Sequence, residues 1–317
     1  MKNNKFINQI IKGDIKKEIQ LIEDKSVDVI ITDPPYFLDK LDNNWDNEKV
    51  NSKANQQVVK SLPAGMKFDP KQGREFYKWF YNLSEEFYRV LKPGGFFFSF
   101  SSPRLYHRLV SAVDDNGFLI KDGFAWIYLK NQPKAMSLNH FIDKMDIDDE
   151  EKEKLKNKLK GWKTPQIKSC FEPIMMAQKP YEKTYLDNMI KNNVGLFNTE
   201  VKVGNNKFPA NLLIVEHINE IMDNYFLIDK PNSKEKGKFN NHLTVKPKEL
   251  IKHLIRLSTF DEESVVFDPF MGSGTTAVAA IEENRKYIGI EISQEYIEIA
   301  KKRIDEIRSK QELPLFS

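Results

Sequence analysis

Short apolar runs alternate with longer amphipathic segments over residues 10–130 and again over residues 247–308. Such alternation is typical of buried parallel strands that are joined by helices, so it predicts a wound α/β fold. We expect strands at residues 10–14, 27–32, 96–100, 124–129, 171–177, 264–267 and 287–290. We expect helices at residues 16–23, 74–91, 105–115, 146–160, 247–258, 275–284 and 294–308.

The alternation is lost in two parts of the chain. Residues 180–241 show no clear pattern of helices and strands, and residues 39–70 are polar and irregular, which predicts a flexible loop. Residues 146–160 are densely charged with few apolar positions, so the helix expected there should be solvated on all sides.

Composition indicates a globular protein without disulfides, membrane spans or a metal site. The 317 residues are 40% hydrophobic, enough for a packed core, and the net charge of +3 means that a nucleic acid would need a local basic surface. The single cysteine, Cys170, excludes a disulfide within the chain. We see neither a signal peptide nor a membrane-spanning run, and expect a soluble, cytoplasmic protein. The five histidines lack metal-ligand spacing, so we expect no metal site.

A strand expected at residues 264–267 runs directly into a glycine-rich turn that precedes a helix. Glycines let a ligand approach the backbone closely, and a helix N-terminus favours a carboxylate or phosphate. Glu291 follows about 20 residues after Gly272, where an acidic side chain can accept hydrogen bonds from both ribose hydroxyls. The pattern predicts a site for an adenosine-containing cofactor. Its candidate ligands are Asp268, Pro269, Phe270, Gly272, Ser273, Gly274, Thr275 and Glu291.

The same turn discriminates among cofactors. An ATP-binding loop needs a lysine after its glycines, whereas Thr275 and Thr276 follow here. The Asp268 carboxylate would repel the pyrophosphate of NAD but attract the ammonium group of a methionine tail. The turn therefore favours S-adenosylmethionine, while NAD stays open from this loop alone.

A second candidate site, Asp33-Pro34-Pro35-Tyr36, follows the strand expected at residues 27–32. Two prolines cannot continue a central strand, so this is a loop at the strand's carboxyl end, where α/β sheets bind ligands. The exocyclic amine of adenine is a poor nucleophile because its lone pair is delocalised. Hydrogen bonds accepted by the Asp33 carboxylate and the Pro34 carbonyl would localise that lone pair and stabilise the developing charge. Tyr36 offers a ring on which a flipped base can stack.

With these two motifs the chain resembles the beta-class adenine-N6 DNA methyltransferases, which carry the catalytic tetrapeptide early and the glycine loop late. Residues 242–247, His-Leu-Thr-Val-Lys-Pro, resemble the family segment that holds the methionine end of the cofactor, apart from Leu243. The resemblance adds Thr244 and Lys246 to the cofactor ligands, and Asp14 of a Gly-Asp pair as a contact to the adenine of the cofactor. Glu172-Pro173 resembles a family Glu-Pro near the base pocket, without a defined role.

The resemblance implies a Rossmann-like methyltransferase fold whose seven-stranded, mostly parallel sheet contains one antiparallel strand. It implies methyl transfer from S-adenosylmethionine to N6 of adenine in double-stranded DNA, by base flipping and direct transfer. We expect residues 1–132 and 241–317 to form one catalytic domain. Residues 133–240 should hold insertions and a target-recognition region.

Partners beyond DNA are less constrained by the sequence. Scattered basic residues could follow the DNA backbone, at Lys53, Lys60, Lys67, Lys71, Arg74, Lys202, Lys207, Lys234, Lys236 and Lys238. Residues 311–316 resemble, with one residue too many, the short peptides that bind bacterial sliding clamps. A homodimer and a cognate restriction endonuclease are further expectations that the residues leave open.

Four other functions stay open at this point. Methyltransferases for cytosine N4 usually have Ser in place of Asp33, and those for RNA or a protein amide more often have Asn. A non-catalytic DNA-binding module would not need Asp33, Tyr36, Gly272 and Glu291 together. A nicotinamide dehydrogenase is disfavoured by Asp268 and by the proline-rich loop.

Overall fold

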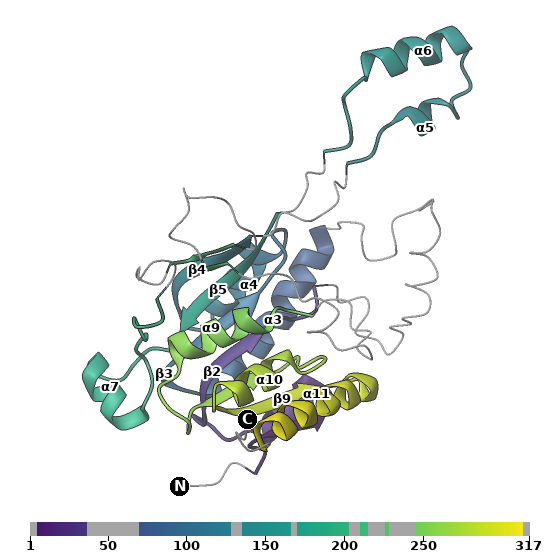
Figure 1. The fold of residues 1–317 in the computed structure, drawn as a ribbon. Helices are drawn as coiled ribbons and strands as arrows, with labels where there is room; N and C mark the ends of the chain where they lie inside the picture. Colours follow the sequence, from purple (N-terminus) through teal and green to yellow (C-terminus); the bar gives the residue numbers. More distant parts are fainter. Residues whose placement is uncertain are drawn as a thin grey trace.

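The computed structural model describes residues 5–36, 70–127, 135–165, 170–202, 210–214, 226–227 and 245–312. Nine strands in these ranges form one sheet in the order β1-β9-β8-β2-β3-β5-β4-β6-β7 (Figure 1). The strands are β1 Gln9–Lys12, β2 Val27–Thr32, β3 Leu91–Phe100, β4 Leu119–Ile127, β5 Phe171–Gln178, β6 Leu212–Ile214, β7 Phe226–Leu227, β8 Val265–Asp268 and β9 Lys286–Glu291.

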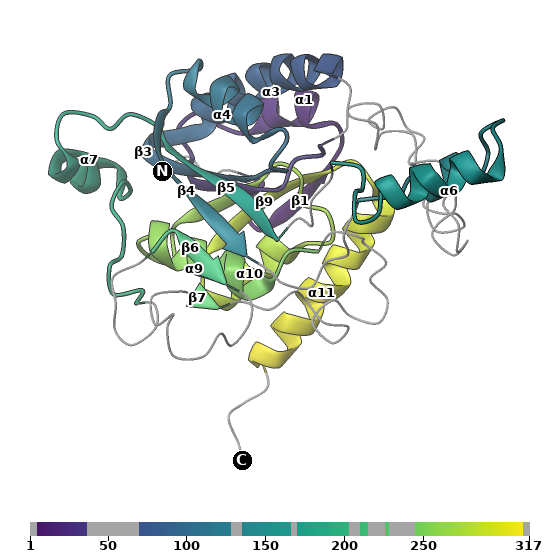
Figure 2. The same cartoon turned by 90° about the horizontal axis from the view of Figure 1, so that it is seen from above.

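Helices cover both faces of the sheet, with α1, α3 and α4 on one side and α9, α10 and α11 on the other (Figure 2). The helical segments are α1 Ile15–Glu18, the 3₁₀ helix η1 Ile19–Leu21, α3 Pro70–Val90, α4 Tyr106–Asp114, α5 Asn139–Ile142, α6 Asp149–Lys158, α7 Tyr185–Asn192, α9 Lys248–Ser258, α10 Thr275–Glu282 and α11 Gln294–Glu312. This three-layer arrangement is the wound α/β fold that the sequence predicts.

The seven strands from β1 to β4 in this order form the Rossmann-like sheet expected from the resemblance. Among the described strands, β5 alone runs antiparallel to its neighbours β3 and β4. The short strands β6 and β7 then extend the sheet beyond β4 in parallel. The mostly parallel seven-stranded sheet is therefore confirmed, with an extension that the sequence pattern did not reveal.

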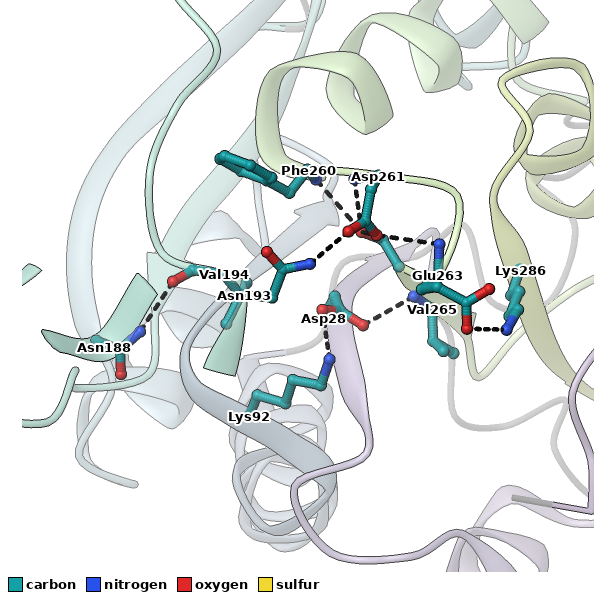
Figure 3. Close-up of polar contacts among 11 residues, drawn as sticks. Asp28, Lys92, Asn188, Asn193, Val194, Phe260, Asp261, Glu263, Val265 and Lys286 are labelled. Carbon is teal, nitrogen blue, oxygen red and sulfur yellow. Dashed lines mark hydrogen bonds and ion pairs between the residues drawn. The ribbon is translucent and has the colours of Figure 1, made fainter. Parts of the chain in front are cut away.

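The central strand β2 is buried along its whole length, as its run of β-branched residues predicts. Ile30 packs with α3 and α4, whereas Val29 and Ile31 pack with α9 and α10, because successive side chains point to opposite faces. Asp28 is the charged residue of this strand. Its carboxylate accepts hydrogen bonds from the Lys92 ammonium at 2.7 Å and from the Val265 amide at 2.8 Å, which joins the starts of three strands (Figure 3).

The middle of the chain differs from its expected organisation. β5, at residues 171–178, lies between β3 and β4 inside the sheet, so the segment 133–240 is not wholly an insertion. The reason is that its apolar residues, such as Ile174 and Met175, are fully buried against both helical layers. Helix α7 and strand β6 also lie where the sequence showed no clear pattern. Helix α6 has no buried residue, which confirms the solvated helix, and it projects with α5 beyond the sheet (Figures 1 and 2).

Several boundaries also shift, and β4 starts at Leu119 rather than at residue 124. β3 starts at Leu91 rather than at residue 96, because Leu91 pairs with Val27 before the register breaks and resumes at Phe96. Helix α3 starts at Pro70, four residues before the expected start, since proline is tolerated in the first turn of a helix. Residues 39–69, the expected loop, lie outside the described ranges. In the part of the chain that is described, no helix has the length and apolar character needed to cross a membrane.

Candidate active site

The two motifs follow adjacent strands. β2 and β8 pair in parallel, so the loops after Thr32 and after Asp268 leave the sheet at the same edge. The Thr32 hydroxyl donates a hydrogen bond to Asp268 at 2.9 Å and links the two strand ends directly. The two outer segments of the chain therefore contribute adjacent strands to one sheet.

The glycine-rich turn is held against the end of β9. Gly272 has a φ of 52°, in the left-handed region that favours glycine, and its amide donates to the Glu291 carboxylate at 2.8 Å. The Ser293 amide donates to the other oxygen of Glu291, also at 2.8 Å. Burial raises the pKa of Glu291, while these amides oppose the rise. The Gly13 amide donates to the Glu291 carbonyl at 3.0 Å, so Asp14, the N-cap of α1, follows directly after this contact with the end of β9.

Asp268 is buried at the start of the turn, between three internal donors. Its carboxylate accepts from the Thr32 hydroxyl, from the Phe270 amide at 3.1 Å and from the Thr276 hydroxyl at 2.6 Å. Burial is the main cause that raises the pKa of Asp268 to about 6, and the hydrogen bonds oppose it. These contacts fix the turn, and the contact to a methionine ammonium expected for Asp268 remains a proposal.

Arg303 of α11 forms hydrogen bonds to the glycine-rich turn, a role that sequence reasoning missed. This buried guanidinium donates to the Ser273 carbonyl at 2.7 Å and to the Ser273 and Thr275 hydroxyls at 3.2 Å. Gly274 has a φ of 82°, and a Cβ there would lie 2.7 Å from the Cβ of Ala300. The glycine at this position is therefore required by the packing of α11. No motif marks Arg303, which lies in an ordinary amphipathic helix.

Four polar side chains meet in the second motif. The Tyr36 hydroxyl lies 2.6 Å from Oδ1 of Asp33 and 3.0 Å from Oε1 of Glu172, which is the second residue of β5. The Lys246 ammonium donates a hydrogen bond to Oδ2 of Asp33 and lies 3.3 Å from Oε1 of Glu172. It also lies 5.1 Å from the centre of the Phe100 ring. We call Asp33, Tyr36, Glu172 and Lys246 the carboxylate cluster.

Lys246 contacts Asp33 and Glu172 in this structure. Its contact with the methionine end of the cofactor, which the resemblance implies, remains a proposal. Its side chain is 10% exposed, against 22% for Asp33 and 17% for Glu172, so the three charges are largely shielded from water. Thr244, the other expected ligand from this segment, lies outside the described residues. Glu172, whose role was undefined, joins the base-site motif.

Burial and neighbouring charges act together on the cluster. Burial is the main cause that raises the pKa of Glu172; the Lys246 ammonium lowers it, and the Asp33 carboxylate raises it. Burial lowers the pKa of Lys246, but the two carboxylates outweigh that effect and raise it overall. Burial and the same two carboxylates hold the pKa of Tyr36 well above its usual value. Lys246 is therefore a cation and Tyr36 a neutral hydroxyl at neutral pH.

The donor set of the turn suits S-adenosylmethionine. Asp268 and Glu291 place carboxylates against a turn that carries no lysine or arginine for a pyrophosphate. Carboxylates match the hydroxyls of a ribose and the ammonium of a methionine. A Rossmann-like sheet with this turn and the Asp-Pro-Pro-Tyr loop on adjacent strands defines an S-adenosylmethionine-dependent methyltransferase.

Comparison with known proteins gives the family. The family described as DNA methylase matches residues 27–302. Type II methyltransferase M.HindIII of Haemophilus influenzae is 33% identical, over 94% of this chain and 96% of that protein. DNA adenine methyltransferase YhdJ of Escherichia coli is 28% identical, over 93% of this chain and 82% of YhdJ. The chain belongs to the DNA methylase family, which confirms the enzyme class and the cofactor S-adenosylmethionine expected from the sequence.

Solved structures agree on the fold. The M1.HpyAVI–SAM complex superposes with a TM-score of 0.52 at 22% identity, over 94% of this chain and 98% of that one. The cytosine-N4-specific PvuII DNA methyltransferase superposes with a TM-score of 0.57 at 18% identity, over 95% of this chain and 90% of that one. Because the PvuII enzyme methylates cytosine, the shared fold does not select the target base, and that choice must come from the site.

Proposed function

We propose that the protein transfers a methyl group from S-adenosylmethionine to N6 of adenine in double-stranded DNA. The observation that carries the proposal is the Asp33 carboxylate, held at the end of β2 beside the glycine turn at the end of β8. An exocyclic amine bound at Asp33 would therefore lie next to a methyl donor bound at the turn.

The loop residues would activate the amine. Asp33 still has lone pairs beyond those used by Tyr36 and Lys246, because a carboxylate can accept about four hydrogen bonds. Asp33 and the Pro34 carbonyl would accept the N6 protons, which localises the lone pair and stabilises the positive charge that develops. Bound S-adenosylmethionine supplies an electrophilic methyl group. The target base would be flipped out of the duplex and stack on the Tyr36 ring.

Adenine is favoured over cytosine by the identity of residue 33. The ionised Asp33 carboxylate is a stronger acceptor for one amine proton than the serine hydroxyl that is usual in enzymes for cytosine N4, and the Pro34 carbonyl accepts the other proton. YhdJ, a relative over most of the chain, is named a DNA adenine methyltransferase. Its name supports the same assignment here.

Sequence recognition belongs to residues 133–240 in this proposal, with β5 left to the sheet. The α5–α6 segment lies in sequence between β4 and β5, whose ends Ile127 and Phe171 pair beside Glu172 of the carboxylate cluster. Lys158, Lys160 and Lys163 are exposed at the end of α6 and in the turn after it. Such lysines can hold DNA phosphates. Of the basic residues singled out earlier, Arg74 and Lys202 are exposed, and the side chains of the others lie outside the described residues.

Partners other than DNA are also part of the proposal. A cognate restriction endonuclease is suggested because M.HindIII is named a type II methyltransferase. A homodimer and a sliding clamp contact rest on the sequence alone, and residues 313–316 of the clamp-like tail lie outside the described residues. A cytoplasmic location follows from a DNA substrate.

The test is nucleoside analysis of DNA treated with the enzyme and isotope-labelled S-adenosylmethionine. We expect labelled N6-methyladenine. Asp33→Ala should bind the cofactor nearly as well in calorimetry and transfer the methyl group about 10² to 10³ times more slowly, the usual cost of one preorganised partner. Labelled N4-methylcytosine, or wild-type rates in Asp33→Ala, would contradict the proposal.

A further inference from the structure

The Tyr36 hydroxyl lies between two carboxylate oxygens, at 2.6 Å from Asp33 and 3.0 Å from Glu172. A phenol has one hydrogen and can donate it in one direction at a time. With both carboxylates ionised the phenol must choose or share its hydrogen, and both contacts are full two-centre hydrogen bonds only when one carboxyl group carries a proton and donates it to the phenol oxygen. The cluster therefore has a place for one additional proton.

Methyl transfer to an amine releases such a proton. We propose, resting on the function proposed above, that Glu172 takes up the proton lost by adenine N6 and that the Tyr36 hydroxyl relays it from Asp33. The N–C bond forms as the C–S bond breaks and leaves its electron pair on sulfur. The N–H bond then breaks, and the proton moves to Asp33. Tyr36 accepts it from Oδ1 of Asp33 while passing its own proton to Oε1 of Glu172.

The charges of the cluster suit this relay. One ammonium, Lys246, faces two carboxylates, so the cluster carries one negative charge before the reaction. The sulfonium loses its positive charge as the methyl group leaves, and protonation of one carboxylate removes one negative charge. The net charge of the buried site is thereby unchanged, which avoids the cost of leaving an uncompensated charge in a shielded place.

Glu172 suits the role of final proton acceptor. Burial raises the pKa of Glu172, so this carboxylate holds a proton more readily than an exposed glutamate. The titratable groups described around it are Asp33 and Tyr36 on the loop after β2 and Lys246 before α9. The high pKa of Tyr36 keeps its hydroxyl protonated, so it passes a proton on without becoming a phenolate.

The first test needs neither cofactor nor DNA. Infrared spectra of the free enzyme with ¹³C-carboxyl-labelled glutamate, recorded across a pH series, should show a glutamate that takes up its proton above the ordinary range. That band should be absent in Glu172→Gln and present in Glu282→Gln. Glu282 is a matched control, since this carboxylate is 19% exposed and pairs with Lys248 and Lys252 away from the site. A band that survives in Glu172→Gln would overturn the assignment.

The second test follows the proton during one turnover, with a pH-indicator dye in weak buffer. The wild-type enzyme should retain the proton until product leaves, whereas Glu172→Gln and Tyr36→Phe should release it as the methyl group transfers. Both variants should also transfer the methyl group about 10² times more slowly, which is the usual contribution of an acid–base group. The fall in rate at low pH that protonation of Glu172 causes in the wild-type enzyme should be absent from both. Glu282→Gln should behave as wild type. If Glu172→Gln releases the proton at the same time and transfers the methyl group at the same rate as wild type, the relay is refuted and adenine methylation stands. If wild-type reactions yield no N6-methyladenine, the proposed function is refuted instead.

Discussion

Replacing Lys246 by methionine tests how the carboxylate cluster is held together. Methionine keeps an apolar stem against the Phe100 ring, near which the ammonium lies, but removes the positive charge. Asp33 and Glu172 would then face each other across Tyr36 without a cation. Removing one partner from a buried ion pair costs about 3–5 kcal/mol of unfolding free energy. Because the two carboxylates are 22% and 17% exposed, solvent screening places the expected loss at the lower end, about 3 kcal/mol.

The unfolding free energy lost in Lys246→Met should be larger at high pH than at low pH. Lys246 lowers the pKa of Glu172, so without this ammonium the carboxylate takes up a proton at a higher pH in the folded state. A folded-state pKa raised above the unfolded value means that the folded protein binds more protons, and its stability then rises as the pH falls through that pKa. The deficit of Lys246→Met should therefore be full where Glu172 is ionised and shrink as the pH falls through the raised pKa, by at most about 1.4 kcal/mol per pH unit. Stability is compared at one pH above this transition and one below it.

Urea unfolding followed by tryptophan fluorescence at both pH values measures this difference. Lys248→Met is the control, because Lys248 pairs with Glu282 at 2.7 Å with 23% of its side chain exposed. The control should lose about 0–1 kcal/mol, with no comparable change between the two pH values. A Lys246→Met protein as stable as wild type at the higher pH, or equally destabilised at both pH values, would refute this account of the cluster.

Three further predictions concern the cofactor turn and the DNA surface. Gly274→Ala should lower the unfolding free energy by about 1–3 kcal/mol, because the new Cβ overpacks against Ala300. The left-handed backbone at this position should cost alanine roughly 1–2 kcal/mol more. An unchanged midpoint in urea unfolding would contradict this prediction. Affinity for S-adenosylmethionine in calorimetry should fall as the pH drops through about 6, where Asp268 takes up a proton; the same pH dependence in Asp268→Asn would assign the effect to another group. Changing Lys158, Lys160 and Lys163 to glutamine should weaken duplex binding and reduce the salt slope by up to about 0.9 for each phosphate that is no longer neutralised, whereas an unchanged slope would exclude this surface.

Local sequence was sufficient for the central strands and for both loops. β2, β8 and β9 are buried on both faces, so they must be continuous apolar runs, and such runs are visible without knowing their neighbours. The Asp33 loop and the Gly272 turn each place their chemistry within a few consecutive residues directly after a strand. Parallel strands bring such loops to one edge of a sheet, so the proximity of the two motifs also followed from the pattern.

Pairing between distant segments was decided by tertiary structure. Apolar periodicity marked residues 171–177 as a strand, but it could not show that this strand lies antiparallel between β3 and β4. Lys246 reaches Asp33 across 213 residues of sequence, and Glu172 reaches Tyr36 across 136. A motif records what neighbouring residues do together, whereas the partner of a buried charge is selected by which segments the folded sheet brings side by side. For that reason the residues of the carboxylate cluster could be named from the sequence, and only the fold showed that they form one site.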